Sequence, residues 1–141
     1  AAALFGALFW FWHAPGPYAT TLGSDLMYWA MHLSLLGGAC ALWAALLGAP
    51  LQALGRAAFA ALATGAQMSL LAVILLVSAM PWHAWHIAGA RPWGLTALAD
   101  QQIAGGLMWV CGALAMGVIA ASTAGLWMRR VEAETSPARD A

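Results

Sequence analysis

The chain has 141 residues, of which 64% are hydrophobic and 7% charged, and its formal net charge at neutral pH is zero. A soluble domain of this length needs more polar surface than these residues supply, so the composition indicates a membrane protein. Five basic residues balance five acidic ones, which leaves no basic face or tail for nucleic acid. Cys40 and Cys111 lie in separate apolar runs without a CxxC motif, so we expect both to be buried as small hydrophobic side chains.

Apolar runs predict an all-α, polytopic transmembrane bundle with three complete spans and a partial first span. A spanning helix needs about 20 apolar residues to cross roughly 30 Å of hydrocarbon. The predicted helices are residues 1–12, 26–47, 57–79 and 99–128. The first of these covers only about 18 Å and is the partial span. We therefore expect one transmembrane domain over residues 1–128, followed by a short polar tail over residues 129–141.

The arginines predict the orientation of the bundle. Breaks rich in proline and glycine follow His13, Gly48 and Met80. The arginines are distributed as follows: Arg56 in the second connection, Arg91 in the third, and Arg129, Arg130 and Arg139 after the last span. The positive-inside rule then predicts a cytoplasmic C-terminus and a cytoplasmic second connection. The first and third connections face outward.

Small residues at every fourth position predict which helix faces pack together. The rows are Gly37-Ala41-Ala45, Ala57-Ala61-Gly65-Ser69 and Ala113-Gly117-Ala121-Gly125. Such rows let helix backbones approach closely inside a membrane. An alanine-rich sequence also produces them by chance. Short connections make neighbouring helices antiparallel in either case.

All four histidines fall in the outer half of this topology. The polar residues of that half are His13, Tyr18, Asp25, His32, His83, His86, Asp100, Gln101 and Gln102. Five tryptophans share the same side, namely Trp10, Trp12, Trp82, Trp85 and Trp93. These are typical of an aromatic belt at the membrane interface, and such a belt offers a purely structural explanation for the neighbouring histidines.

His32 is the histidine that lies clearly within a predicted span. It follows Asp25 by two helical turns, so both residues share one helix face. An ionisable residue at this depth must face a bundle interior or a wet cavity, which makes it a functional candidate. Met27 and Met31 flank it, although methionine also serves as ordinary core filling.

Imidazole and thioether groups together favour copper, because soft sulfur suits Cu(I) and imidazole accepts both oxidation states. Zinc is the alternative for the histidines alone. The predicted metal ligands are His13, His32, His83, His86 and Met31, and the supporting polar residues are Asp25, Asp100 and Gln101. Asp100 has three alternative roles: a ligand, a partner that orients a histidine, or the N-cap of the last helix. The N-cap is the role that we favour.

Other chemistries fit the sequence less well. The serines lack the context of a catalytic nucleophile, and paired haem ligation needs histidines at matching depth on two helices. Proton transfer through Asp25, His32 and Asp100 would stop halfway across the membrane. The sequence therefore predicts no enzyme.

Three segments of the chain resemble the CtaG-type cytochrome c oxidase assembly factors, in their C-terminal four-helix portion. They are Trp12-His13-Ala14-Pro15 with Tyr18 soon after, Met31-His32, and GLTALADQQIAGGLMWV over residues 94–110. The resemblance covers nearly the whole chain, and its DQQ..GG.MWV string is the most specific part. By position it implies functional roles for His13, His32 and Asp100 with Gln101.

The resemblance also implies a function. Similar proteins are multi-pass proteins of the bacterial inner membrane that help to mature haem–copper oxidases of the respiratory chain. The implied activity is delivery of copper on the periplasmic side, with oxidase subunits and membrane lipid as partners. The alternative is a non-catalytic accessory subunit that stabilises a respiratory or other membrane complex, which the absence of the family's N-terminal spans favours.

The chain departs from the family pattern after the third predicted helix. Relatives tend to have a proline and a tyrosine-rich turn there, whereas this chain has MPWHAWH over residues 80–86. We therefore expect His13 and His32 to be the central ligands. His83 and His86 become additional ligands near the surface, and Trp82 and Trp85 become interface anchors.

Overall fold

The computed structural model describes residues 1–135, which form helices and connections without a strand. The helices are α1 (Ala2–His13), α2 (Pro15–Gly23), α3 (Asp25–Leu47), α4 (Leu54–Val77), α5 (His86–Gly89) and α6 (Ala97–Thr135), with short 3-10 turns η1 (Leu51–Ala53) and η2 (Arg91–Trp93). Three helical segments are long and apolar enough to cross a membrane: α3, η1 with α4, and α6. The predicted all-α bundle with three complete spans is confirmed. α1 is a shorter apolar helix, and its role as a partial span stays a prediction, as does the cytoplasmic C-terminus.

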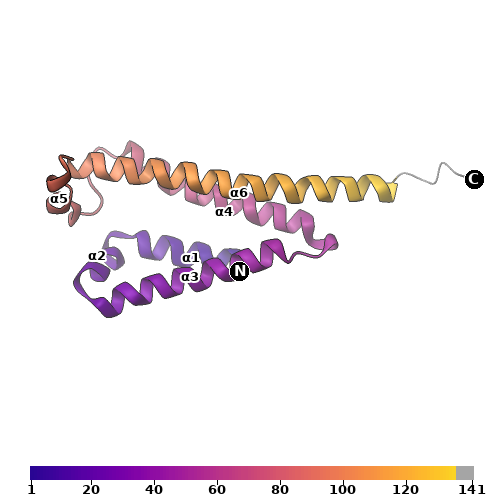
Figure 1. Cartoon of the computed structure of the whole chain (residues 1–141), viewed down its shortest axis with the longest axis horizontal. Coiled ribbons are helices and arrows are strands. Elements are labelled where there is room, and N and C mark those ends of the chain that lie inside the picture. Colours follow the sequence, from indigo (N-terminus) through magenta and orange to yellow (C-terminus); the bar gives the residue numbers. More distant parts are fainter. Residues whose placement is uncertain (136–141) are drawn as a thin grey trace, which may run out of the picture.

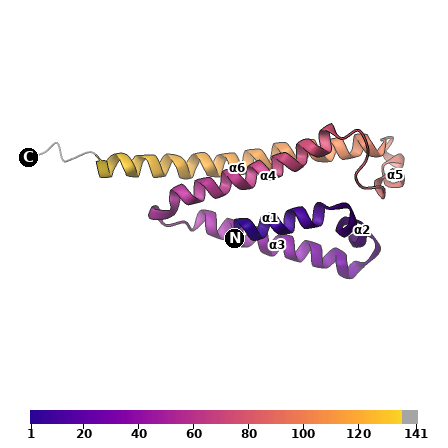
Figure 2. The same cartoon turned by 180° about the vertical axis from the view of Figure 1, so that it is seen from behind.

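The helices form two pairs that lie along one common axis (Figure 1). α4 packs against α6, and α1 packs against α3. α3, α4 and α6 alternate in direction, as the short connections predict (Figure 2). α2 and α5 lie at the same end of the molecule, and α6 ends at the opposite end (Figures 1 and 2). The first and third connections therefore meet in space.

Side-chain caps mark where the long helices begin. The Ser24 hydroxyl accepts a hydrogen bond from the Met27 amide at 3.5 Å at the start of α3. The Thr96 hydroxyl accepts one from the Ala99 amide at 3.1 Å at the start of α6. Both are the arrangement of a helix N-cap. The favoured role of Asp100 as the cap of the last helix is wrong, because Thr96 occupies the cap and Asp100 lies in the first turn.

The small-residue row of α4 packs inside the bundle, as predicted. Ala57 and Ala61 are buried, and a Cβ on Gly65 would lie 3.1 Å from the Met116 Cβ. The rows predicted for the other two spans are wrong. Ala41, Ala45, Ala113 and Ala121 are exposed, and the buried faces of those helices instead carry Gly38, Leu42 and Leu46 in α3 and Gly105, Gly112, Met116 and Ala120 in α6.

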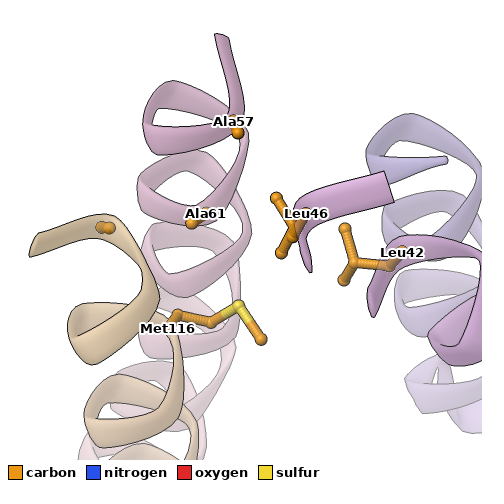
Figure 3. Packing of buried hydrophobic residues seen from close by; sticks show 6 residues of the cluster. Leu42, Leu46, Ala57, Ala61 and Met116 are labelled. Carbon is orange, nitrogen blue, oxygen red and sulfur yellow. The ribbon is translucent and has the colours of Figure 1, made fainter. Parts of the chain in front are cut away.

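In α3 and α6, the rows that pack lie one residue away from the predicted rows. In an alanine-rich helix several adjacent rows repeat at four, so the spacing alone does not select the row, and larger side chains of an adjacent row can fill the space between helices. Leu42 and Leu46 do so in α3, where they meet Ala57 and Ala61 of α4 and Met116 of α6 (Figure 3). A second buried cluster joins Phe9 of α1 to Leu71 and Leu75 of α4.

The two cysteines are exposed on the surfaces of their helices, so the prediction of burial is wrong for both Cys40 and Cys111. The outer face of a membrane helix is itself apolar, so an apolar sequence context does not indicate the interior.

The last helix extends beyond the predicted span and into the predicted polar tail. α6 ends at Thr135, and Arg130 Nε lies 2.7 Å from Glu134 Oε1, an ion pair one turn apart. Arg139 lies outside the described residues.

Candidate functional site

A cavity of about 290 Å³ lies at the end of the molecule that carries α2 and α5. Its walls come from both helix pairs and from the third connection. The lining residues are His13, Tyr18, Leu75, His83, His86, Ala97, Asp100, Gln101, Ala104 and Met108. Polar and apolar side chains thus line the same space, the usual composition of a ligand site.

Gln101 holds the walls of this cavity together. Its Nε2 donates to the Leu75 carbonyl at 3.1 Å, and its Oε1 accepts from the Trp82 amide at 2.6 Å. The neighbouring Gln102 donates to the Leu76 carbonyl at 3.2 Å. These carbonyls belong to the last turn of α4, where helix carbonyls lack partners within the helix. The adjacent glutamines therefore fasten the end of α4 to α6, and Gln101 also fixes the segment that leads into His83.

Tyr18, His86 and Asp100 form a hydrogen-bonded chain across the cavity. His86 Nδ1 lies 3.1 Å from Asp100 Oδ2, and His86 Nε2 lies 2.7 Å from the Tyr18 hydroxyl oxygen. An ionised carboxylate can only accept, so it fixes the proton of a neutral His86 on Nδ1. Nε2 then carries the lone pair that accepts the Tyr18 hydroxyl. Burial and the negative charge of Asp100 raise the pKa of Tyr18, so the hydroxyl keeps its proton.

His83 packs against the face of Tyr18, with ring centroids 4.1 Å apart. Its Nδ1 is buried and has no hydrogen-bond partner among the described residues. Burial lowers the pKa of His83, and the nearby His86 and His13 lower it further. The ring is therefore held neutral, with a nitrogen that lacks the partner that buried polar atoms normally have.

His13 enters the cavity from the end of α1. Its Nδ1 lies 2.7 Å from the Phe9 carbonyl oxygen, which can only accept, so Nδ1 donates and the lone pair of a neutral ring lies on Nε2. His13 and His86 are thus both set in the same tautomer by an oxygen acceptor.

The structure divides the predicted site residues into two groups. His13, His83, His86, Asp100 and Gln101 line the cavity. His32 and Asp25 are exposed, and Met31 is half-buried in α3 away from the cavity.

His32 differs most from the expectation. Its Nδ1 bonds to the Tyr28 carbonyl of its own helix at 2.9 Å, and its ring lies against the Tyr28 ring. The face that His32 shares with Asp25 is the outer face of α3. Trp85 is exposed, as an interface anchor would be, whereas Trp82 packs against the buried cluster around Phe9.

Two cavity residues with a hydroxyl or thioether group were not among the predicted site residues. Tyr18 reaches His86 from α2, and Met108 lies on the inner side of α6. Tyr18 follows the Trp-His-x-Pro turn closely in sequence, and Met108 follows Asp100 by about two turns of one helix. These spacings are the signals that the sequence offers for the two residues. Only the fold shows that Tyr18 contacts the third connection.

In this arrangement, the histidine side chains do not form a metal site. Within residues 1–135, no three His, Cys, Asp or Glu side chains converge as a metal site requires. At the third connection, the Tyr18 hydroxyl already occupies His86 Nε2, at 2.7 Å. The donors that remain available are the lone pairs of His13 and His83 and the thioether of Met108.

The fold and this cavity define a polytopic helical membrane protein with a histidine-rich site at one end. Residues 1–130 match the family described as cytochrome c oxidase caa3 assembly factor (Caa3_CtaG). The chain belongs to this family, and the resemblance seen in the sequence is confirmed. Comparison with curated proteins and with solved structures found no match.

Proposed function

We propose that this chain assists the assembly of a cytochrome c oxidase by binding copper in the cavity and passing it to an oxidase subunit. Family membership supports the role in assembly. The observation that carries the copper proposal is that His13, His83, His86 and Met108 all line one cavity.

The hydrogen bonds of the histidines support metal binding. A metal-ligating histidine usually donates its other ring N–H to a carboxylate or a backbone carbonyl, which fixes the tautomer and raises its basicity. His86 has this arrangement with Asp100, and His13 has it with the Phe9 carbonyl. The thioether of Met108 favours Cu(I) over zinc, because soft sulfur ligands select soft metals.

The position of the cavity supports transfer on the periplasmic side of a bacterial inner membrane. Arg56 and Arg130 lie toward the end of the bundle opposite the cavity, as the course of α4 and α6 indicates (Figure 1). The positive-inside rule assigns that end to the cytoplasm. The cavity then faces outward, where a partner can reach it.

The proposal is tested by Cu(I) competition between the detergent-purified protein and a chromogenic chelator. We expect the double variant His13→Ala with His83→Ala to lower Cu(I) affinity at least about tenfold, or about 1.4 kcal/mol. His32→Ala is the matched control, because it removes an imidazole at the same end of the bundle but outside the cavity. We expect it to bind as the wild type does. Unchanged affinity in the double variant would refute the site.

The stoichiometry of the purified oxidase distinguishes assembly from the role of a permanent accessory subunit. An assembly factor leaves the finished enzyme, so we expect well under one copy per oxidase. A subunit is retained at one copy per oxidase, and that result would refute the assembly role. Quantitative mass spectrometry of oxidase purified through its own subunit measures this ratio.

A further inference from the structure

The Tyr18 hydroxyl lies 2.7 Å from His86 Nε2, the nitrogen through which His86 could share a metal ion with His83. The two histidine rings have centroids 6.4 Å apart, and the Tyr18 ring lies 4.1 Å from His83 and 5.7 Å from His86. Metal–nitrogen bonds of about 2.0 Å, added to the ring radii, place two imidazoles on one ion roughly 6 Å apart. The separation of the histidines is therefore close to what a shared ion allows, and the obstacle is the hydrogen bond between the Tyr18 hydroxyl and His86 Nε2.

We propose that the Tyr18 hydroxyl competes with copper for His86 Nε2 and that this competition keeps the site suited to release. The inference rests on the proposed function, since it describes the same cavity. When Cu(I) enters, the hydrogen bond from Tyr18 to Nε2 breaks and a copper–nitrogen bond forms at that lone pair. Tyr18 keeps its proton, and Asp100 continues to accept from Nδ1. No proton or electron is transferred.

The two partners of this hydrogen bond are placed so that it can open without disturbing the spans. Tyr18 belongs to the nine-residue α2, which is flanked by extended backbone at Ala14 and Ser24. His86 begins the four-residue α5 in the third connection. Both side chains come from connections at the end of the bundle, whereas Asp100 belongs to the spanning helix α6. Replacement of the Tyr18 hydroxyl by copper therefore moves Tyr18 and leaves the hydrogen bond between His86 and Asp100 in place.

The competition between the Tyr18 hydroxyl and copper predicts a measurable change in Cu(I) affinity. A hydrogen bond of this kind contributes modestly in net terms, so its removal should raise Cu(I) affinity about three- to tenfold. Tyr18→Phe is the appropriate variant, because it keeps the ring against His83 and removes only the hydroxyl. We also expect copper to pass more slowly from this variant to a chelator.

Tyr28→Phe is the matched control. The Tyr28 ring also lies 4.1 Å from a histidine, His32, but the Tyr28 hydroxyl makes no hydrogen bond within the described part of the chain. We expect its Cu(I) affinity to equal that of the wild type. The chain has two tyrosines, so this control also leaves Tyr18 as the only tyrosine signal for NMR.

A second measurement uses the Tyr28→Phe variant, in which Tyr18 is the only tyrosine. With ¹³C-labelled tyrosine in Tyr28→Phe protein, the Tyr18 Cζ signal should move when Cu(I) is added, because the hydroxyl loses its acceptor. Unchanged or weaker Cu(I) binding by Tyr18→Phe, or a Cζ signal that stays in place while copper binds, would overturn the inference and leave the proposed function standing. Failure of the wild type to bind Cu(I) would overturn both.

Discussion

Gln101 stabilises the cavity end of the bundle through both atoms of its amide. It is 8% exposed, and its partners are the Leu75 carbonyl and the Trp82 amide. We predict that Gln101→Met, which keeps the length of the side chain, leaves both partners without a hydrogen bond. An unsatisfied buried polar group costs about 1–3 kcal/mol. The expected loss in the free energy of unfolding, for two such groups, is therefore about 2–6 kcal/mol.

Gln102→Met is the control for this prediction. Gln102 makes one such bond, to the Leu76 carbonyl, and it is less buried. Its replacement should cost about 1–2 kcal/mol. Unfolding in mixed micelles of SDS and a non-ionic detergent, followed by circular dichroism, measures both variants against the wild type.

The two variants should also differ in Cu(I) binding. The Trp82 amide directly precedes His83, so Gln101→Met releases the segment that places this histidine in the cavity wall. Gln102→Met leaves that segment held. Equal losses of stability in the two variants, or no loss for Gln101→Met, would refute the role assigned to the Gln101 amide.

Two further predictions concern helix packing and pH. Gly105→Ala should cost about 1–3 kcal/mol in unfolding free energy, because the new Cβ would lie 3.1 Å from the Ala72 carbonyl oxygen. Gly106→Ala, which meets nothing within 4 Å among the described residues, should gain up to about 1 kcal/mol. Burial holds the pKa of His83 below 6.5 in the folded chain. Lowering the pH from 6.5 to the pKa of the folded chain should therefore lower the free energy of unfolding.

The controls for these predictions use the same unfolding assay. A loss at Gly106 that matches the loss at Gly105 would contradict the close approach of α4 and α6. For the pH effect, the sign follows from proton binding: the unfolded chain takes up a proton that the folded chain excludes. His83→Gln should remove that part of the pH dependence. An unchanged pH dependence in His83→Gln would show that other groups cause it.

The sequence by itself determined the class of this protein and its spans. Long apolar runs leave a chain no alternative to helices in lipid, because every backbone polar group must bond internally. Three segments, of which the DQQ..GG.MWV string is the most specific, indicated the family that the match over residues 1–130 confirms. The row of α4 that packs was also predictable, since Ala57 and Ala61 lie on the face with the smallest side chains.

Only the tertiary structure decided which polar residues form a site. His32 and Asp25 share a helix face in sequence, but the direction of that face depends on how α3 packs against α1, and it points outward. His86 meets Asp100 and Tyr18 because the first and third connections close over the same end of the bundle. Local periodicity describes one helix at a time, whereas the cavity arises from contacts between segments that are far apart in the chain.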